Sequence, residues 1–262
     1  MSLTGKTLAN SYKDILQMGQ SNSGIGTSAN VVQDGEGTHS ALFLSDDSVI
    51  ISPRNDDTTS AFGVLTTGST GVFSVDTTNQ LVYASGNLVN TQYATFSIGN
   101  VETSLFVDDT HHAITFQNAN YGVAAYPPAF GTGTDPATTF TTSNGNGTRG
   151  SDLVPVLWFV PDAISIDSVT SFEGADAATG DTTRMHLFSY TFTSGSTSAL
   201  TSGTLLAHNS DVTNAGSEQV YKTSWTVDSA AVTAGKVILA FFKSDSVNSD
   251  YSVNITVKYH LT

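Results

Sequence analysis

Short apolar segments separated by polar residues recur through the first part of the chain. Each segment is only a few residues long, and the residues between segments are mainly Gly, Asp, Asn, Ser and Thr. Apolar segments spaced roughly 8–12 residues apart, with turn-forming residues between them, are typical of an all-β array. We therefore expect short strands at 41–44, 49–51, 62–65, 72–75, 81–83, 93–98 and 105–107.

These predicted strands contain much Thr and Gly and few large apolar side chains. One chain cannot enclose a core with so little apolar bulk, because a small unit buries too small a fraction of its surface. Identical chains in a homo-oligomer would supply each other's buried face. We expect residues 41–107 to form an oligomerising shaft or connector.

After Val107 the predicted strands lengthen and gain aromatic residues. Residues 251–261 alternate strictly between apolar and polar, which predicts a strand with one buried and one wet face. The fold class is therefore all-β, with the short-strand region followed by an antiparallel β-sandwich, most simply a jelly roll. The expected strands of this sandwich are 112–116, 154–160, 164–172, 185–192, 204–207, 220–227, 237–242 and 251–261.

The chain divides into three predicted parts: an attachment segment (1–40), the connector (41–107) and a C-terminal head (108–262). Residues 7–18 form the one good helical candidate. Its apolar residues share one face at spacings of three and four: Leu8, Tyr12, Ile15 and Leu16. Because so short a helix is marginal alone, we expect it either to cap the following sheet or to dock on a larger assembly.

The charge of the chain excludes several kinds of partner. Only 12% of residues are charged, and 23 acids against 9 Lys and Arg give a net charge of -14. Such a surface repels phosphate backbones, so we expect no nucleic-acid binding. No apolar run is long enough for a membrane span or a signal peptide, and we expect neither membrane insertion nor export through a signal peptide. Cysteine is absent, which removes disulfides and thiolate chemistry.

Two acidic clusters in the sequence are candidates for a metal site or a catalytic site. Residues 108–112 read Asp-Asp-Thr-His-His, but strand alternation would divide these metal-ligand types between two faces, so a surface turn is favoured over a metal site. Glycoside cleavage needs two convergent carboxylates. The dense acidic group with Glu173, Asp176 and Asp181 is instead expected to be a solvated loop. We expect no catalytic, cofactor-binding or metal-binding residues and no cofactor.

Two loops carry further alternatives. Residues 76–79 read Asp-Thr-Thr-Asn between alternating segments, which predicts a hairpin or solenoid-like corner more than a calcium loop. Residues 131–150 form a long Gly-, Thr-, Asn- and Ser-rich loop. Before it, Tyr121, Tyr126 and Phe130 form either an exposed platform that contacts a receptor or an anchor for the loop.

Several stretches resemble the tail-fibre-like virion proteins of marine tailed bacteriophages. The C-terminal stretches 173–185 and 244–261 look similar to the heads of such chains. The N-terminal resemblance lies in residues 8–17, 21–25, 34–37, 73–79 and 89–93.

The resemblance implies a non-enzymatic structural protein on the virion surface, assembled in the host cytoplasm. It implies a homotrimer whose N-terminal region binds other virion proteins and whose head contacts a host cell-surface glycan or protein. A capsid decoration protein or head fibre is the alternative, and a polysaccharide depolymerase is a third. Weak contacts from several identical heads would give strong attachment through avidity.

Overall fold

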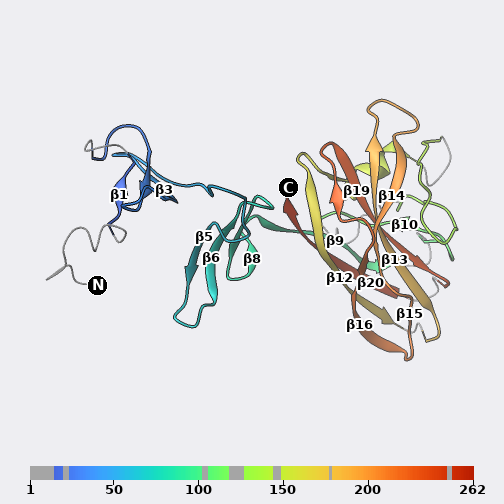
Figure 1. Ribbon diagram of the computed structural model, residues 1–262. Coiled ribbons are helices and arrows are strands. Elements are labelled where there is room, and N and C mark those ends of the chain that lie inside the picture. The colour runs from blue at the N-terminus through green and yellow to red at the C-terminus, as the bar shows by residue number, and fades with distance from the viewer. Residues whose placement is uncertain are drawn as a thin grey trace. The chain divides into compact units, whose positions relative to one another are not determined.

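The computed structural model is almost entirely β-structure (Figure 1). Two compact units divide the chain, one reaching Val89 and the other beginning at Asn90. No helix among the described residues has the length and apolar character needed to cross a membrane. The structure describes residues 15–19, 24–101, 106–117, 127–143, 149–176, 179–246 and 250–262.

The N-terminal unit contains two antiparallel four-stranded sheets, each formed by consecutive strands. The first consists of β1 (Gln17–Met18), β2 (Asn30–Gln33), β3 (His39–Leu44) and β4 (Val49–Ile51). The second consists of β5 (Phe62–Leu65), β6 (Gly71–Asp76), β7 (Leu81–Ala84) and β8 (Asn87–Leu88).

Five of the short strands predicted in this unit are confirmed almost to the residue. β6 and β7 form a hairpin, as one of the two predictions for residues 76–79 required. The Asp76 carboxylate closes the turn by accepting hydrogen bonds from the Asn79 backbone N–H at 2.9 Å and from the Asn79 Nδ2 at 2.8 Å. Asp and Asn favour turns for this reason.

Two predicted boundaries differ from the structure. The strand predicted at 93–98 is the centre of β9 (Thr91–Val101), which pairs with the last strand of the chain and therefore belongs to the head. The head thus begins at Asn90 and not at residue 108. The boundary predicted after residue 40 falls inside β3. Local pattern reveals a strand but not the distant strand with which it pairs.

The head is an antiparallel β-sandwich, as predicted; its jelly-roll connectivity stays a prediction. One sheet has the order β16-β12-β20-β9, with β18 paired to β12. The other has the order β10-β19-β13-β14-β17, with β11 paired to β19 and β15 to β13. The long strands are β12 (Ile164–Asp176), β13 (Thr182–Phe192), β14 (Leu200–His208), β16 (Glu218–Ser224), β19 (Lys236–Ser244) and β20 (Asp250–Leu261). The short ones are β10 (His112–Ala113), β11 (Trp158–Phe159), β15 (Val212–Thr213), β17 (Thr226–Val227) and β18 (Ala231–Val232).

Two apolar cores stabilise the head. The larger lies between the sheets and includes Ile255 and Val257 of β20, on the face that the alternation predicted to be buried. The smaller core covers the other side of β13 and β19, where the loop residue Phe130 packs on Phe241 and Phe140 packs on Phe130. β19 is therefore buried on both faces, which explains its continuous apolar sequence.

Three local predictions differ from the structure. Within the predicted helix 7–18, Gln17 and Met18 form a strand, and residues 7–14 lie outside the described part. The strand predicted at 154–160 is instead the 3-10 helix η2 (Val154–Val156) followed by β11, with the short helix α2 (Gly150–Leu153) before it. Pro155 lies in the first turn of η2, where a missing N–H costs nothing. Of residues 105–107, Phe106 and Val107 lie outside any strand, and Leu105 is not among the described residues.

Candidate functional site

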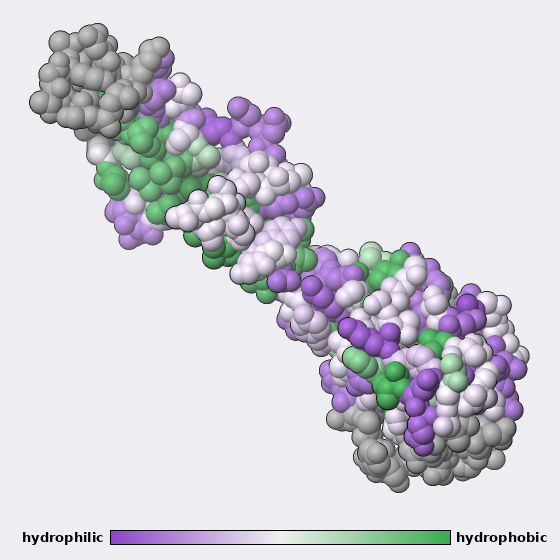
Figure 2. Space-filling model, turned by 90° about the horizontal axis from the view of Figure 1, so that it is seen from below, coloured by the Kyte–Doolittle hydropathy of each residue, from purple (hydrophilic) through white to green (hydrophobic). Residues whose placement is uncertain are grey.

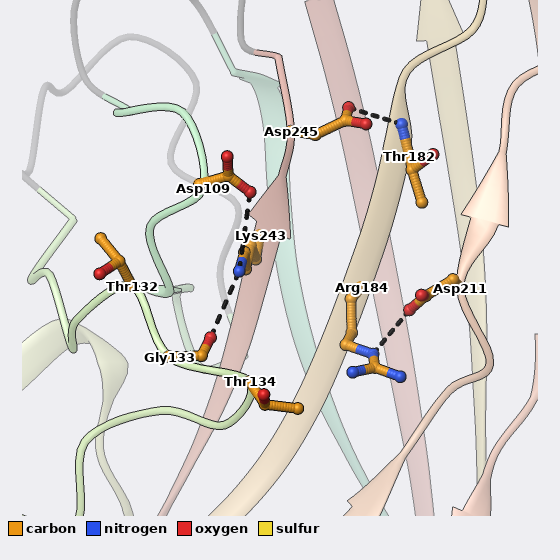
Figure 3. A pocket seen from close by; sticks show the side chains of 9 residues that line it. All are labelled: Asp109, Thr132, Gly133, Thr134, Thr182, Arg184, Asp211, Lys243 and Asp245. Carbon is orange, nitrogen blue, oxygen red and sulfur yellow. Dashed lines mark hydrogen bonds and ion pairs between the residues drawn. The ribbon is translucent and has the colours of Figure 1, made fainter.

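A polar pocket of about 600 Å³ opens on the head, where β13 and β19 meet two loops (Figure 3). Arg184 on β13 and Lys243 on β19 supply its cations, and three carboxylates come from the surrounding loops. Its lining residues are Asp109, Thr132, Gly133, Thr134, Thr182, Arg184, Asp211, Lys243 and Asp245.

The charged groups of the pocket are held by one another and by the backbone. Arg184 Nε lies 2.6 Å from Asp211 Oδ1, and the Asp245 carboxylate accepts a hydrogen bond from the Thr182 backbone N–H at 2.7 Å. Lys243 Nζ donates a hydrogen bond to the Gly133 carbonyl at 3.3 Å and lies 3.7 Å from Asp109 Oδ1 (Figure 3).

Two buried histidine rings, His111 and His186, lie 4.9 Å apart beside this pocket. Burial lowers the pKa of His111 to about 4, against a raising effect of its hydrogen bond to the carbonyl of Gly133 at 3.1 Å. Burial also lowers the pKa of His186 to about 3, although Asp135 Oδ1 lies 3.3 Å from its Nε2. Both rings are therefore neutral near pH 7, and their role is packing.

The prediction of a surface turn at 108–112 is right for the two aspartates and wrong for the histidines. Asp109 is exposed with φ 57°, but the chain then turns inward so that β10 pairs with β19. His112 is buried, accepts a hydrogen bond from the Val107 N–H at 3.0 Å and donates one to the Pro127 carbonyl at 3.1 Å. Within the described part of the chain, no three His, Asp or Glu side chains are placed to hold a metal ion.

The sequence predicted a solvated loop at Glu173, and this prediction is wrong. β12 continues to Asp176, and the Glu173 side chain points between the two sheets with 3% of its surface exposed. Thr183 Oγ1 donates to its Oε1 at 2.5 Å, whereas Oε2 has no partner among the described residues. Burial raises the pKa of Glu173 from 4.5 to about 6, although the Thr183 hydrogen bond opposes this.

Asp181 is partly buried in the connection before β13, where it accepts a hydrogen bond from the Tyr251 hydroxyl at 2.9 Å. The side chain of Asp176 lies outside the described residues. Because the Glu173 carboxyl is enclosed between sheets, it offers no oxygen to a polysaccharide in solvent. Strand alternation would have predicted the inward orientation of Glu173, because residues 171, 173 and 175 share the inward face of β12.

The residues expected to contact a receptor or the virion have different outcomes. Phe130 is 2% exposed and packs on Phe241 with ring centroids 4.7 Å apart, so the prediction of an exposed platform is wrong for it. Tyr121 and Tyr126 lie outside the described residues, as do Leu8 and Tyr12. Ile15 is partly buried and Leu16 is exposed, in extended chain before β1.

In the second sheet of the N-terminal unit, strands β5 to β7 carry apolar side chains on one face. Directly opposed residues of antiparallel strands point to the same side of a sheet, and the register joins Phe62 with Val75, Val64 with Phe73, and Val75 with Val82. We call this the apolar face of β5–β7; its members are Phe62, Val64, Phe73, Val75, Val82 and Ala84.

Much of this apolar face lies in solvent. Val64 is 46% exposed, and Phe62 and Val82 are also exposed. Phe62 and Phe73 contact each other edge to face, with centroids 6.2 Å apart; Phe62 is 42% exposed and Phe73 is partly buried. Figure 2 shows hydrophobic surface over the N-terminal unit. An exposed apolar sheet face marks an interaction site.

No protein-family model matches this chain, and no curated protein matches it either.

Proposed function

We propose that this protein is a structural protein of a tailed-bacteriophage virion, a homotrimeric fibre- or spike-like appendage. Its N-terminal region would attach to the particle and its head would contact the host surface. The contrast between the two units supports this proposal most. The head encloses two cores of its own, whereas the apolar face of β5–β7 lies in solvent. A second and third copy of the same chain supply the missing layer.

The size of this face indicates that both N-terminal sheets take part. Three strands at about 4.8 Å spacing and about four residues of 3.3 Å each give a face of roughly 200 Å² in projection. A specific interface buries about 800 Å² per partner. The first sheet offers further apolar surface, because Val49, Ile50 and Ile51 of β4 are all exposed.

Sedimentation of matched variants tests the assembly. Val64→Lys places an ammonium on the apolar face of β5–β7, and Ser74→Lys places the same group on the opposite face of β6. We expect a trimer at micromolar concentration for the wild type and for Ser74→Lys, and a smaller species for Val64→Lys. A folded wild-type monomer at that concentration would contradict the proposal.

Attachment to the particle is tested by deletion. Because the first sheet extends from β1 to β4, removal of residues 1–55 deletes it whole and leaves β5 intact. We expect particles assembled with the truncated protein to lack it, measured by mass spectrometry of purified virions, with the full-length chain as control. Normal incorporation of the truncated chain would refute the assignment of attachment to this region.

A capsid decoration protein or head fibre would use the same assembly surfaces at another address. An electron-microscopy map of the particle separates the two, since the chain would lie at the tail in one case and across the capsid in the other. The proposal includes no enzymatic activity, which the enclosed carboxyl of Glu173 supports. Release of reducing sugar from host polysaccharide, abolished by Glu173→Gln, would overturn it.

A further inference from the structure

The sheet β16-β12-β20-β9 has a solvent-facing outer side whose composition differs from the rest of the head. Strand β20 places Val253 and Ile255 in the core and Asn254 and Thr256 outward. The register continues this outer side across the sheet, since Thr256 lies opposite both Thr170 and Thr95, and Asn254 lies opposite Ser97. Thr, Ser and Asn side chains predominate at its centre, and β16 adds the exposed Glu218, Val220 and Lys222 at its edge.

Two aromatic rings stand in this polar field. Phe172 of β12 is 49% exposed and Tyr93 of β9 is 64% exposed. Phe172 lies directly opposite Lys222 of β16, and Tyr93 lies directly opposite Lys258 of β20. Each ring is thus the cross-strand neighbour of a lysine side chain, and directly opposed residues lie close together.

The two lysines are unusual in this chain. It has only 9 Lys and Arg and a net charge of -14, yet Lys222 and Lys258 share one side of one sheet. Neither ammonium forms an ion pair or hydrogen bond with any described residue, unlike Lys243 in the pocket. Their charge is therefore available to an anionic ligand.

We propose that the outer side of β16-β12-β20-β9 binds an anionic glycan of the host surface, with sugar rings on Phe172 and Tyr93 and carboxylates near Lys222 and Lys258. The proposal rests on the proposed function, because it gives the head its receptor class. The C–H face of a sugar packs on an aromatic ring, its hydroxyls match the Thr and Asn side chains, and an acidic group complements the lysines.

The composition of this outer side argues against another protein, or a second copy of the head, as its ligand. Lys and Ser are depleted in the cores of protein interfaces, so another protein or a second head fits this surface poorly. Two copies meeting here would also bring lysines of like charge together.

Calorimetry of the full-length protein with an oligogalacturonate, a polymer of uronic acid, tests the proposal. A maltooligosaccharide of equal length is the neutral control. We expect the oligogalacturonate to bind more tightly, and Phe172→Ala to weaken that binding about tenfold. Phe192→Ala is the matched control, because Phe192 is 43% exposed at the end of β13 in the other sheet and should leave binding unchanged.

Lys222→Gln provides a second variant that preserves the fold. We expect it to weaken binding at low salt and to reduce the dependence of affinity on sodium chloride, since it removes one ion contact. Equal affinity for the two glycans, no binding, or equal weakening by Phe172→Ala and Phe192→Ala would each overturn the proposal.

Sedimentation of the same samples separates this failure from failure of the proposed function. A wild-type trimer that binds neither glycan overturns the glycan site alone, whereas a monomer that binds oligogalacturonate overturns the assembly alone. Dissociation of the oligomer by Phe172→Ala would show that this surface joins two heads and would also overturn the glycan site.

Discussion

The buried carboxyl of Glu173 is expected to make the stability of the head fall as pH rises. Glu173 has a pKa of about 6 in the folded protein against an ordinary value of 4.5, because burial disfavours its charged form. The folded state therefore binds this proton more tightly than the unfolded state does. The resulting stabilisation is complete below about pH 4.5 and is lost as pH rises through about 6.

The size of the effect follows from that difference. A difference of about 1.5 in pKa, at about 1.4 kcal/mol per unit, corresponds to about 2 kcal/mol. We expect Glu173→Gln to abolish this contribution. Its free energy of unfolding minus that of the wild type should then rise by about 2 kcal/mol between pH 4 and pH 7.5. The Gln amide adds a cost beside the partnerless Oε2 position, but that cost is independent of pH.

Urea unfolding followed by tryptophan fluorescence measures this difference, because Trp158 and Trp225 both lie in the larger core of the head. The buried histidines contribute in the opposite sense at low pH, and subtraction of the wild-type curve removes their contribution. Asp162→Asn, at an exposed position before β12, is the control variant. Parallel pH curves for Glu173→Gln and the wild type would refute this account of Glu173.

Three further substitutions test the packing of the head by urea unfolding. Gly203→Ala should destabilise it by about 1–3 kcal/mol, because the new Cβ would lie 2.6 Å from a Tyr190 ring carbon; an unchanged midpoint would contradict this. Asn209→Ala should cost about 1–3 kcal/mol, since it removes the acceptor that the buried Met185 N–H uses at 2.6 Å, and a neutral result would show that another acceptor replaces it. Phe241→Ala should cost about 3–5 kcal/mol, because its ring packs in the smaller core; a loss below 1 kcal/mol would place that core outside the cooperative unit.

The exposed and buried faces of β20 show what the local sequence pattern can predict. Its alternation predicted six inward residues from Tyr251 to Leu261. The structure buries Tyr251, Val253, Ile255 and Val257, whereas Tyr259 is only partly buried and Leu261 is 40% exposed. The short strands β4 and β5 were predicted at their observed bounds because each is a short apolar segment between turn-forming residues. The sequence also determined the all-β class and the shortage of core in the N-terminal part.

Only the tertiary structure decided which distant segments meet. β9 follows the connector in sequence but pairs with β20, and this long-range pairing moved the domain boundary to Asn90. Phe130 follows a Pro-rich stretch and precedes a Gly-rich loop, yet that loop folds over β19 and buries the ring. The outer side that carries Phe172 and Lys222 exists only because β12 and β16 are in register. Side-chain alternation is local and can be read directly, whereas strand pairing depends on the free energy of contacts between residues far apart in the chain.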